Sequence, residues 1–169
     1  MHTKVHYIFS YLFILITVSS CFKKEEYPIE PKITFDNFII IGDSATLSFN
    51  FTDGDGDIGL APSDTLAPYN PNSEFYYNIY LHYYEKDDSQ GWIEGTDIQG
   101  DPLIFKYRIK PIEFKGKSKG IKGVIEIDMG TLYYNIFSNQ SDTIKYSIQL
   151  IDRALNKSNL IYTNEIINI

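Results

Sequence analysis

Residues 143–151, with the sequence TIKYSIQLI, alternate between polar and apolar side chains along most of their length. Successive side chains of an extended strand point to opposite faces, so every second residue lies on the same face. The apolar side chains that share one face are Ile144, Tyr146, Ile148 and Leu150. Lys145, Ser147 and Gln149 lie on the other face. This pattern predicts a β-strand in a sheet with one buried and one solvated side.

Six other runs of β-branched and aromatic residues, separated by clusters of Gly, Asp, Asn and Pro, predict further strands. Together the predicted strands are Ile33–Ile40, Ala45–Phe51, Phe75–Tyr84, Leu103–Ile109, Gly123–Met129, Thr143–Ile151 and Leu160–Ile169. No window offers a dozen residues of helical period with caps. About seven short strands favour an all-β fold, namely a two-sheet β-sandwich of immunoglobulin-like type. A small β-barrel is the alternative.

The N-terminal segment reads as an export signal. Lys4 precedes an apolar run, Tyr7–Val18, which is followed by Ser19, Ser20 and the only cysteine, Cys21. This run is shorter than the roughly 20 apolar residues that span a bilayer, and a cation, a short apolar run and small residues are typical of a cleaved signal. The segment resembles a bacterial lipoprotein signal peptide ending in a lipobox, which implies cleavage before Cys21 and lipidation of Cys21. The alternative is an ordinary secretory signal cleaved at another bond.

These features divide the chain into a signal peptide (1–20), an acylated Cys21 with a tether (21–32) and one β-sandwich domain (33–169). The tether sequence, FKKEEYPIEPK after the cysteine, is charged and contains prolines, which indicates an extended linker. Its Lys24-Glu25-Glu26 is similar to short charged signals that send lipoproteins of Bacteroidota to the outer face of the outer membrane. An ordinary solvated linker has the same composition. We expect a lipid-anchored protein of the cell envelope, in the outer membrane, on either face.

Charge and residue counts exclude several classes of function. The net charge of −7 makes nucleic acid an unexpected partner. His2 and His6 belong to the predicted signal, so His82 is the only histidine of the expected domain, which excludes a multi-histidine zinc site in one chain. With Cys21 acylated, no thiol remains for disulfides or for nucleophilic attack.

The segment 49–60, FNFTDGDGDIGL, has the densest group of candidate metal-ligating residues in the sequence. Asp53, Asp55 and Asp57 alternate with Gly54 and Gly56, so a flexible backbone can turn several oxygens toward one point. Calcium prefers about six to eight hard oxygen ligands in a tolerant geometry, and we therefore expect calcium here. An EF-hand is improbable: its twelfth position would be Asp64, but isoleucine replaces the required glycine and strands flank the loop. The alternative is a plain Asp-Gly turn.

A second acidic segment is expected to join this loop. Asp152 and Asn156 follow the strand at 143–151. In an immunoglobulin-like sandwich, the loop after the second strand and the loop between the last two strands lie at the same end. The predicted metal ligands are Asp53, Asp55, Asp57 and Asp152, with Asn156 as a further candidate. The alternative gives Asp152 a surface charge role and Asn156 a turn role.

The chain is rich in aromatic residues, with 14 tyrosines and 11 phenylalanines. Tyr76, Tyr80 and Tyr84 alternate on one face of a predicted strand and form a candidate surface for a glycan or a protein. The alternative is that they pack inside the protein. His82 lies on the same face, but no G-x-S-x-G sequence accompanies it, and Glu85 with Glu94 is only one of many acidic pairs that could suggest a glycosidase.

The lipobox, the FTDGDGDIG loop and the IDRALNKSN segment resemble those of uncharacterised Bacteroidota lipoproteins with immunoglobulin-like or cadherin-like domains. The resemblance brings no activity with it. We expect a lipid-anchored binding or structural module stabilised by calcium and without catalysis. A carbohydrate-binding surface lipoprotein is the first alternative, and an envelope hydrolase is the second. The expected partners are the membrane, through the lipid on Cys21, and an envelope protein or glycan.

Overall fold

The computed structural model describes residues 26–112, 120–140 and 142–167. In these ranges the chain forms nine β-strands and no helix. Accordingly, the described residues include no helix that could cross a membrane. The predicted signal peptide (1–20), Cys21 and the first residues of the predicted tether (22–25) lie outside the described residues.

The first sheet has three antiparallel strands in the order β1-β2-β6. They are β1 (Lys32–Ile41), β2 (Ser44–Asp53) and β6 (Ile121–Gly130). β1 and β2 form a hairpin in which Ile41 pairs with Ser44 at the turn and Lys32 pairs with Thr52 at the other end. The acidic loop therefore begins at the end of β2 that lies beside the start of β1.

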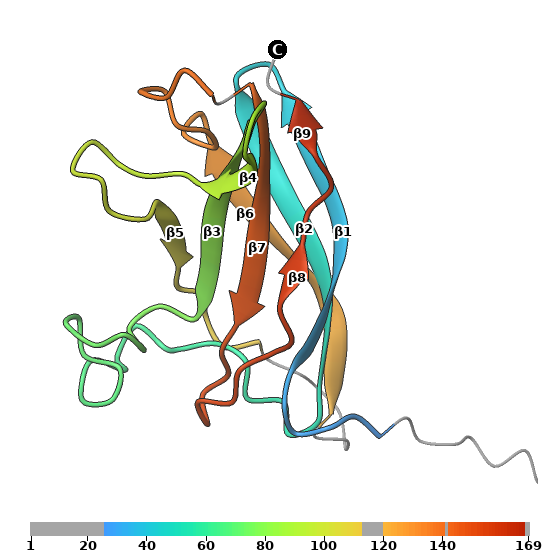
Figure 1. Ribbon diagram of the computed structural model, residues 1–169. Helices are drawn as coiled ribbons and strands as arrows, with labels where there is room; N and C mark the ends of the chain where they lie inside the picture. Colours follow the sequence, from blue (N-terminus) through green and yellow to red (C-terminus); the bar gives the residue numbers. More distant parts are fainter. Residues whose placement is uncertain (1–25, 113–119, 141, 168–169) are drawn as a thin grey trace, which may run out of the picture.

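The second sheet has six strands, with the path β4-β3-β7-β8, β5 paired to β3 and β9 paired to β7. The strands are β3 (Ile79–Asp87), β4 (Gly91–Glu94), β5 (Ile104–Tyr107), β7 (Thr143–Leu150), β8 (Ile161–Tyr162) and β9 (Ile166–Ile167). All of the pairings are antiparallel. In Figure 1 the two sheets form two layers.

The core lies between the two sheets. The side chains predicted to face it from β7 are fully buried, which confirms the predicted inner face of residues 143–151. On the other face Lys145 and Gln149 are partly exposed, but Ser147, expected to be solvated, is buried. The other large core residues include Ile33, Leu47 and Phe49 from the first sheet and Ile79, Leu81 and Tyr83 from the second. Tyr146 lies at the centre, and its ring contacts those of Phe38, Tyr83 and Phe105 at centroid distances of 5.6 to 6.0 Å.

The β-sandwich is confirmed, and the β-barrel alternative is wrong because the two sheets are not joined into one closed sheet. The predicted last strand is interrupted. Residues 163–165 separate β8 from β9, and Oγ1 of Thr163 accepts the N–H of Tyr146 at 3.0 Å. A threonine hydroxyl here takes the place of a backbone carbonyl, which is how such side chains compete with a ladder. The short strand β4, of four residues, was not predicted.

The predicted strand at 75–84 is displaced toward the C-terminus, since β3 begins only at Ile79. Asn78 is fully buried just before it, and its Oδ1 accepts the N–H of Ile109 at 2.9 Å. Its backbone carbonyl accepts the N–H of Ile151. The side chain of Asn78 thus substitutes for backbone pairing, and residues 75–77 leave the sheet.

Candidate cation site

The sequence-predicted ligands come together at one end of the sandwich. Asp53 ends β2, Asp55 and Asp57 lie in the loop that follows, and Asp152 follows β7. One carboxylate oxygen from each lies within 4.8 Å of those from the others. Oxygens bound to one calcium ion at about 2.3–2.6 Å are at most about 5 Å apart. The four carboxylates therefore lie within the span of one calcium coordination shell.

Two of these residues are buried and two are partly exposed, and three of the four carboxylates have an oxygen without a donor. Asp53 has an exposed fraction of 0% and Asp152 of 2%. Oδ1 of Asp53, Asp55 and Asp57 is inaccessible to solvent and has no hydrogen-bond partner. Buried polar atoms in folded proteins are normally paired, and leaving one unpaired costs about 1–3 kcal/mol. Three unpaired oxygen acceptors in one place are the ligands that a hard cation binds.

The loop after β2 is held in shape by its own backbone. Oδ2 of Asp53 accepts the N–H of Asp57 at 2.9 Å, which closes the turn. Gly56 has a φ of 74°, a left-handed conformation that glycine adopts without strain. The carbonyl of Asp57 accepts the N–H of Arg153 at 3.2 Å. The acidic loop is thus joined by a backbone hydrogen bond to the loop that carries Asp152.

The second loop is built around Asp152. Its Oδ1 accepts the N–H of Asn156 at 2.7 Å, and its Oδ2 accepts the side-chain amide of Asn156 at 2.8 Å. The carbonyl of Asn156 accepts the N–H of Asp152 at 3.1 Å. Asn156 therefore orients the Asp152 carboxylate and closes the turn, as the alternative interpretation of the sequence had it.

Burial and mutual repulsion raise the pKa values of these carboxyl groups. Burial raises the pKa of Asp53 to about 6, and the charges of Asp55 and Asp57 add to the rise. Burial likewise raises the pKa of Asp57 to about 6, with further contributions from Asp152 and Asp55. The pKa of Asp152 is also raised, first by burial. Two unit charges 4.8 Å apart repel by roughly 3.5 kcal/mol at an effective dielectric constant of about 20.

Asp64 lies outside this cluster. Its carboxylate forms a two-pronged ion pair with Arg153, at 2.7 and 3.0 Å. The hydrogen bond from Arg153 is the main reason that the pKa of Asp64 is lowered. The residue at the twelfth position of an EF-hand count thus faces a cation of the chain itself, in agreement with the rejection of that motif.

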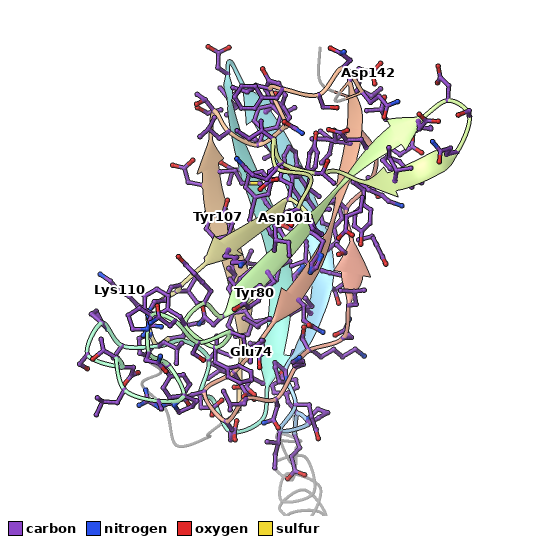
Figure 2. All side chains as sticks on the ribbon, turned by 60° about the vertical axis from the view of Figure 1, so that its left-hand side comes forward. Glu74, Tyr80, Asp101, Tyr107, Lys110 and Asp142 are labelled. Atoms are coloured by element: carbon purple, nitrogen blue, oxygen red, sulfur yellow. The ribbon has the colours of Figure 1, made fainter. Side chains whose placement is uncertain are left out.

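The tyrosines predicted to form one stripe are placed in different surroundings. Tyr80 and Tyr84 lie on the outer face of β3, because the residues that alternate with them are buried in the core. Tyr76 precedes the strand, and its ring faces the guanidinium of Arg108 at 4.6 Å. The hydroxyl of Tyr80 donates to the carbonyl of Glu74, and both residues are labelled in Figure 2. A continuous stripe from Tyr76 to Tyr84 is therefore not formed.

A different group of aromatic residues surrounds Lys145. Lys145 pairs with Tyr84 across β3 and β7. Its Nζ lies 4.3 Å from the ring centroid of Trp92, 5.3 Å from that of Tyr162 and 5.8 Å from that of Tyr84. The sequence analysis missed this group because Trp92 lies on the short strand β4 and Tyr162 on the interrupted last strand. Only the position of Lys145 on the solvated face of its strand gave a signal.

His82 and the acidic pair proposed for a hydrolase do not form a common site. His82 lies on the outer face, with its Nδ1 3.1 Å from Oε1 of Glu94. Glu94 pairs with Tyr84 and so belongs to that same face. Glu85 is 4% exposed and points into the opposite side of the sheet, where its Oε2 accepts the hydroxyl of Ser138 at 2.7 Å. Glu85 and Glu94 therefore cannot flank one glycosidic bond.

No protein-family model and no curated protein matches this chain. Among solved structures it is similar to the crystal structure of wild-type OgpA from Akkermansia muciniphila, with 14% sequence identity and a TM-score of 0.34. The match covers 89% of this chain and 34% of that one, so the chain spans about a third of its length. A likeness this distant carries no functional argument.

Proposed function

We propose that this protein is a non-catalytic, calcium-stabilised binding or structural module of the cell envelope. The observation that supports the proposal is the carboxylate of Asp53, which is fully buried and has an unpartnered oxygen among three other carboxylates. Such a group is unfavourable unless a cation compensates its charge. Asp53, Asp55, Asp57 and Asp152 would hold the ion, and loop carbonyls or water would complete its shell.

In this proposal the ion has a structural role. It joins the loop after β2 to the loop after β7, and these loops belong to different sheets. Thermal unfolding of the full chain in nonionic detergent, first in calcium and then in chelator, tests the proposal. Calcium at a hundred times its dissociation constant should add roughly 2.7 kcal/mol to the free energy of unfolding. Identical unfolding curves would refute it.

We further propose that the protein is anchored through lipid on Cys21. The support is the sequence of the first 21 residues, which resembles a lipoprotein signal peptide. Growth of expressing bacteria with radiolabelled palmitate tests this part. Labelled protein from the natural sequence and none from a Cys21→Ser variant is the expected outcome. Equal labelling of both would exclude acylation at Cys21.

The second candidate function is carbohydrate binding by the outer face of the six-stranded sheet. The observation that favours it is the group of three aromatic rings around Lys145, because aromatic faces stack on sugar rings and flanking charged groups bind hydroxyls. Trp92 is the only tryptophan of the chain, so its fluorescence reports directly on this surface. A glycan array followed by fluorescence titration of Trp92 tests the candidate, and a silent array would remove it.

A further inference from the structure

The segment that leads into β1 lies directly against the acidic loop. A Cβ atom on Gly54 would come within 3.0 Å of the carbonyl oxygens of both Tyr27 and Pro28. Real Cβ atoms essentially never make such contacts. Gly54 therefore allows the backbone of residues 27–28 to cross the loop that holds Asp53 and Asp55. Residues 26–31 are here called the docked tether. They were expected to be an extended linker, but Tyr27 and Pro28 pack on the domain.

The ring of Tyr27 strengthens this contact. A Cβ atom on Gly120 would lie 3.2 Å from Cδ2 of Tyr27 and 3.5 Å from the carbonyl oxygens of Asp53 and Gly54. Tyr27 thus lies between the acidic loop and the residue before β6, and its side chain is half-buried. An aromatic ring wedged at this position fixes the direction in which the chain enters the sandwich.

The second loop of the site also holds the incoming chain. The Oδ1 of Asn159 accepts the N–H of Ile33 at 2.9 Å, and its side-chain amide donates to the carbonyl of Ile33 at 3.0 Å. This side chain pairs with β1 as a neighbouring strand would. Both loops that supply carboxylates to the cation site therefore contact the chain where it enters the domain, at the lower end in Figure 1.

We propose that the cation site acts as a clasp that fastens the docked tether to the domain. This inference rests on the proposed cation binding. An ion that bridges Asp53, Asp55 and Asp57 to Asp152 holds the acidic loop in the conformation in which Gly54 receives residues 27–28. Without the ion, four carboxylates within 4.8 Å of one another repel, the loop opens, and the docked tether is released.

The clasp sets how far the domain reaches from its anchor. Six residue steps separate Cys21 from Tyr27, and eleven separate it from Lys32, where β1 begins. At about 3.3–3.6 Å per residue these steps span at most roughly 20 Å and roughly 38 Å. If Cys21 carries the lipid, release of the cation nearly doubles the maximal distance between the anchor and the sandwich.

Limited proteolysis of the full chain in nonionic detergent tests the clasp. A glutamate-specific protease cleaves the bond between Glu26 and Tyr27, and the fragment that begins at Tyr27 is quantified by mass spectrometry. Glu26 itself is exposed, but the protease must also bind the residues after the bond, and Tyr27 and Pro28 lie against Gly54. Cleavage therefore requires the docked tether to leave the surface, and its rate follows the open population when opening is fast. Calcium at a hundred times its dissociation constant should slow this cleavage by up to about 100-fold.

Three variants make the test specific. In Asp55→Asn, calcium should no longer slow cleavage. Tyr27→Ala leaves the acidic loop unchanged. It should keep a calcium-dependent midpoint of unfolding but be cleaved rapidly with and without calcium, because the docked tether loses the ring that packs beside Gly120. Ile41→Ala is the control, since Ile41 is 78% exposed and lies at the β1–β2 turn, at the other end of β2.

The two proposals fail in different ways. A calcium-dependent midpoint combined with a cleavage rate that calcium does not change would refute the clasp and leave the structural cation site intact. A midpoint and a cleavage rate that are both indifferent to calcium would refute both. Protection by calcium that survives in Asp55→Asn would also overturn the clasp, because it would place the effect elsewhere.

Discussion

Replacing Asp55 by asparagine should have opposite effects on stability in chelator and in calcium. Oδ1 of Asp55 has no partner, and no hydrogen bond within the described residues holds the carboxylate. In contrast, Asp53 and Asp152 each accept hydrogen bonds that shape their loops. Asp55→Asn therefore removes one charge from the cluster with little change to the scaffold, and it isolates the electrostatic part of the site.

In chelator the variant should be more stable than the natural protein. One pair of charges at 4.8 Å costs between roughly 0.9 kcal/mol in water and roughly 3.5 kcal/mol at an effective dielectric constant of about 20. Asp55 is partly exposed, so the lower part of this range applies. A gain of about 1 kcal/mol corresponds to a rise of about 2–4 °C in the midpoint for a domain of this size.

In calcium the order should reverse. The natural protein should gain roughly 2.7 kcal/mol, or roughly 5–10 °C, at a hundred times the dissociation constant. The variant, with one anionic ligand fewer, should lose most of this shift. Circular dichroism melts and calorimetric titration with calcium measure the two effects. Asp43→Asn is the matched control, because Asp43 is an exposed acid in the β1–β2 turn at the other end of β2.

The reasoning would be refuted by a variant that is less stable in chelator by the same amount as in calcium. That result would mean that the Asp55 carboxylate stabilises the loop by itself, as in a plain Asp-Gly turn, and that the four carboxylates do not repel one another appreciably.

Three further predictions concern the same fold. In calcium-free buffer, acidification from pH 7 to pH 5 should raise the midpoint of unfolding. The pKa values of Asp53 and Asp57 are raised to about 6, so the folded state binds these protons more tightly than the unfolded state. A double Asp53→Asn, Asp57→Asn variant, melted at the same pH values, should lack this rise. Leu155→Gly should stabilise the protein by roughly 1 kcal/mol in denaturant titrations, since a φ of 70° strains leucine and not glycine. A loss of stability would show that the contacts of the leucine side chain outweigh the backbone strain. Tyr146→Phe should destabilise by about 1–3 kcal/mol in the same assay, because the buried hydroxyl donates to the carbonyl of Tyr133, and an unchanged midpoint would contradict this.

The layers of the fold were predictable because their signal is local and repeated. Alternation of residues 143–151 fixes which face is buried, and each of the other predicted strands overlaps an observed one. The ends of the strands were not predictable in the same way. At Asn78 and Thr163 a side chain replaces a backbone partner across the sheet, and this depends on residues that are distant in sequence. Strand propensity carries no information about such substitutions.

The acidic cluster was predictable from two facts together. The spacing of Asp53, Asp55 and Asp57 suggests a common focus, and the topology of a sandwich places Asp152 at the same end. The aromatic group around Lys145 was not predictable, since its members come from three different strands and one of these was missed. Tyr76 was wrongly grouped with Tyr84, because the strand was expected to begin before residue 79.

The docking of residues 27–28 on Gly54 explains why sequence composition alone misassigned the tether. A charged segment with two prolines has the composition of a free linker, and the contact that holds it is made by backbone carbonyls that every residue possesses. The only sequence signal for this contact was Gly54, the residue that receives the tether, and the sequence analysis had assigned that glycine to bending the acidic loop. Gly54 therefore serves two neighbours at once, the loop that gathers the carboxylates and the chain that crosses it. A change in one is then transmitted to the other, and this shared glycine is the physical reason to expect cation binding and tether docking to be coupled.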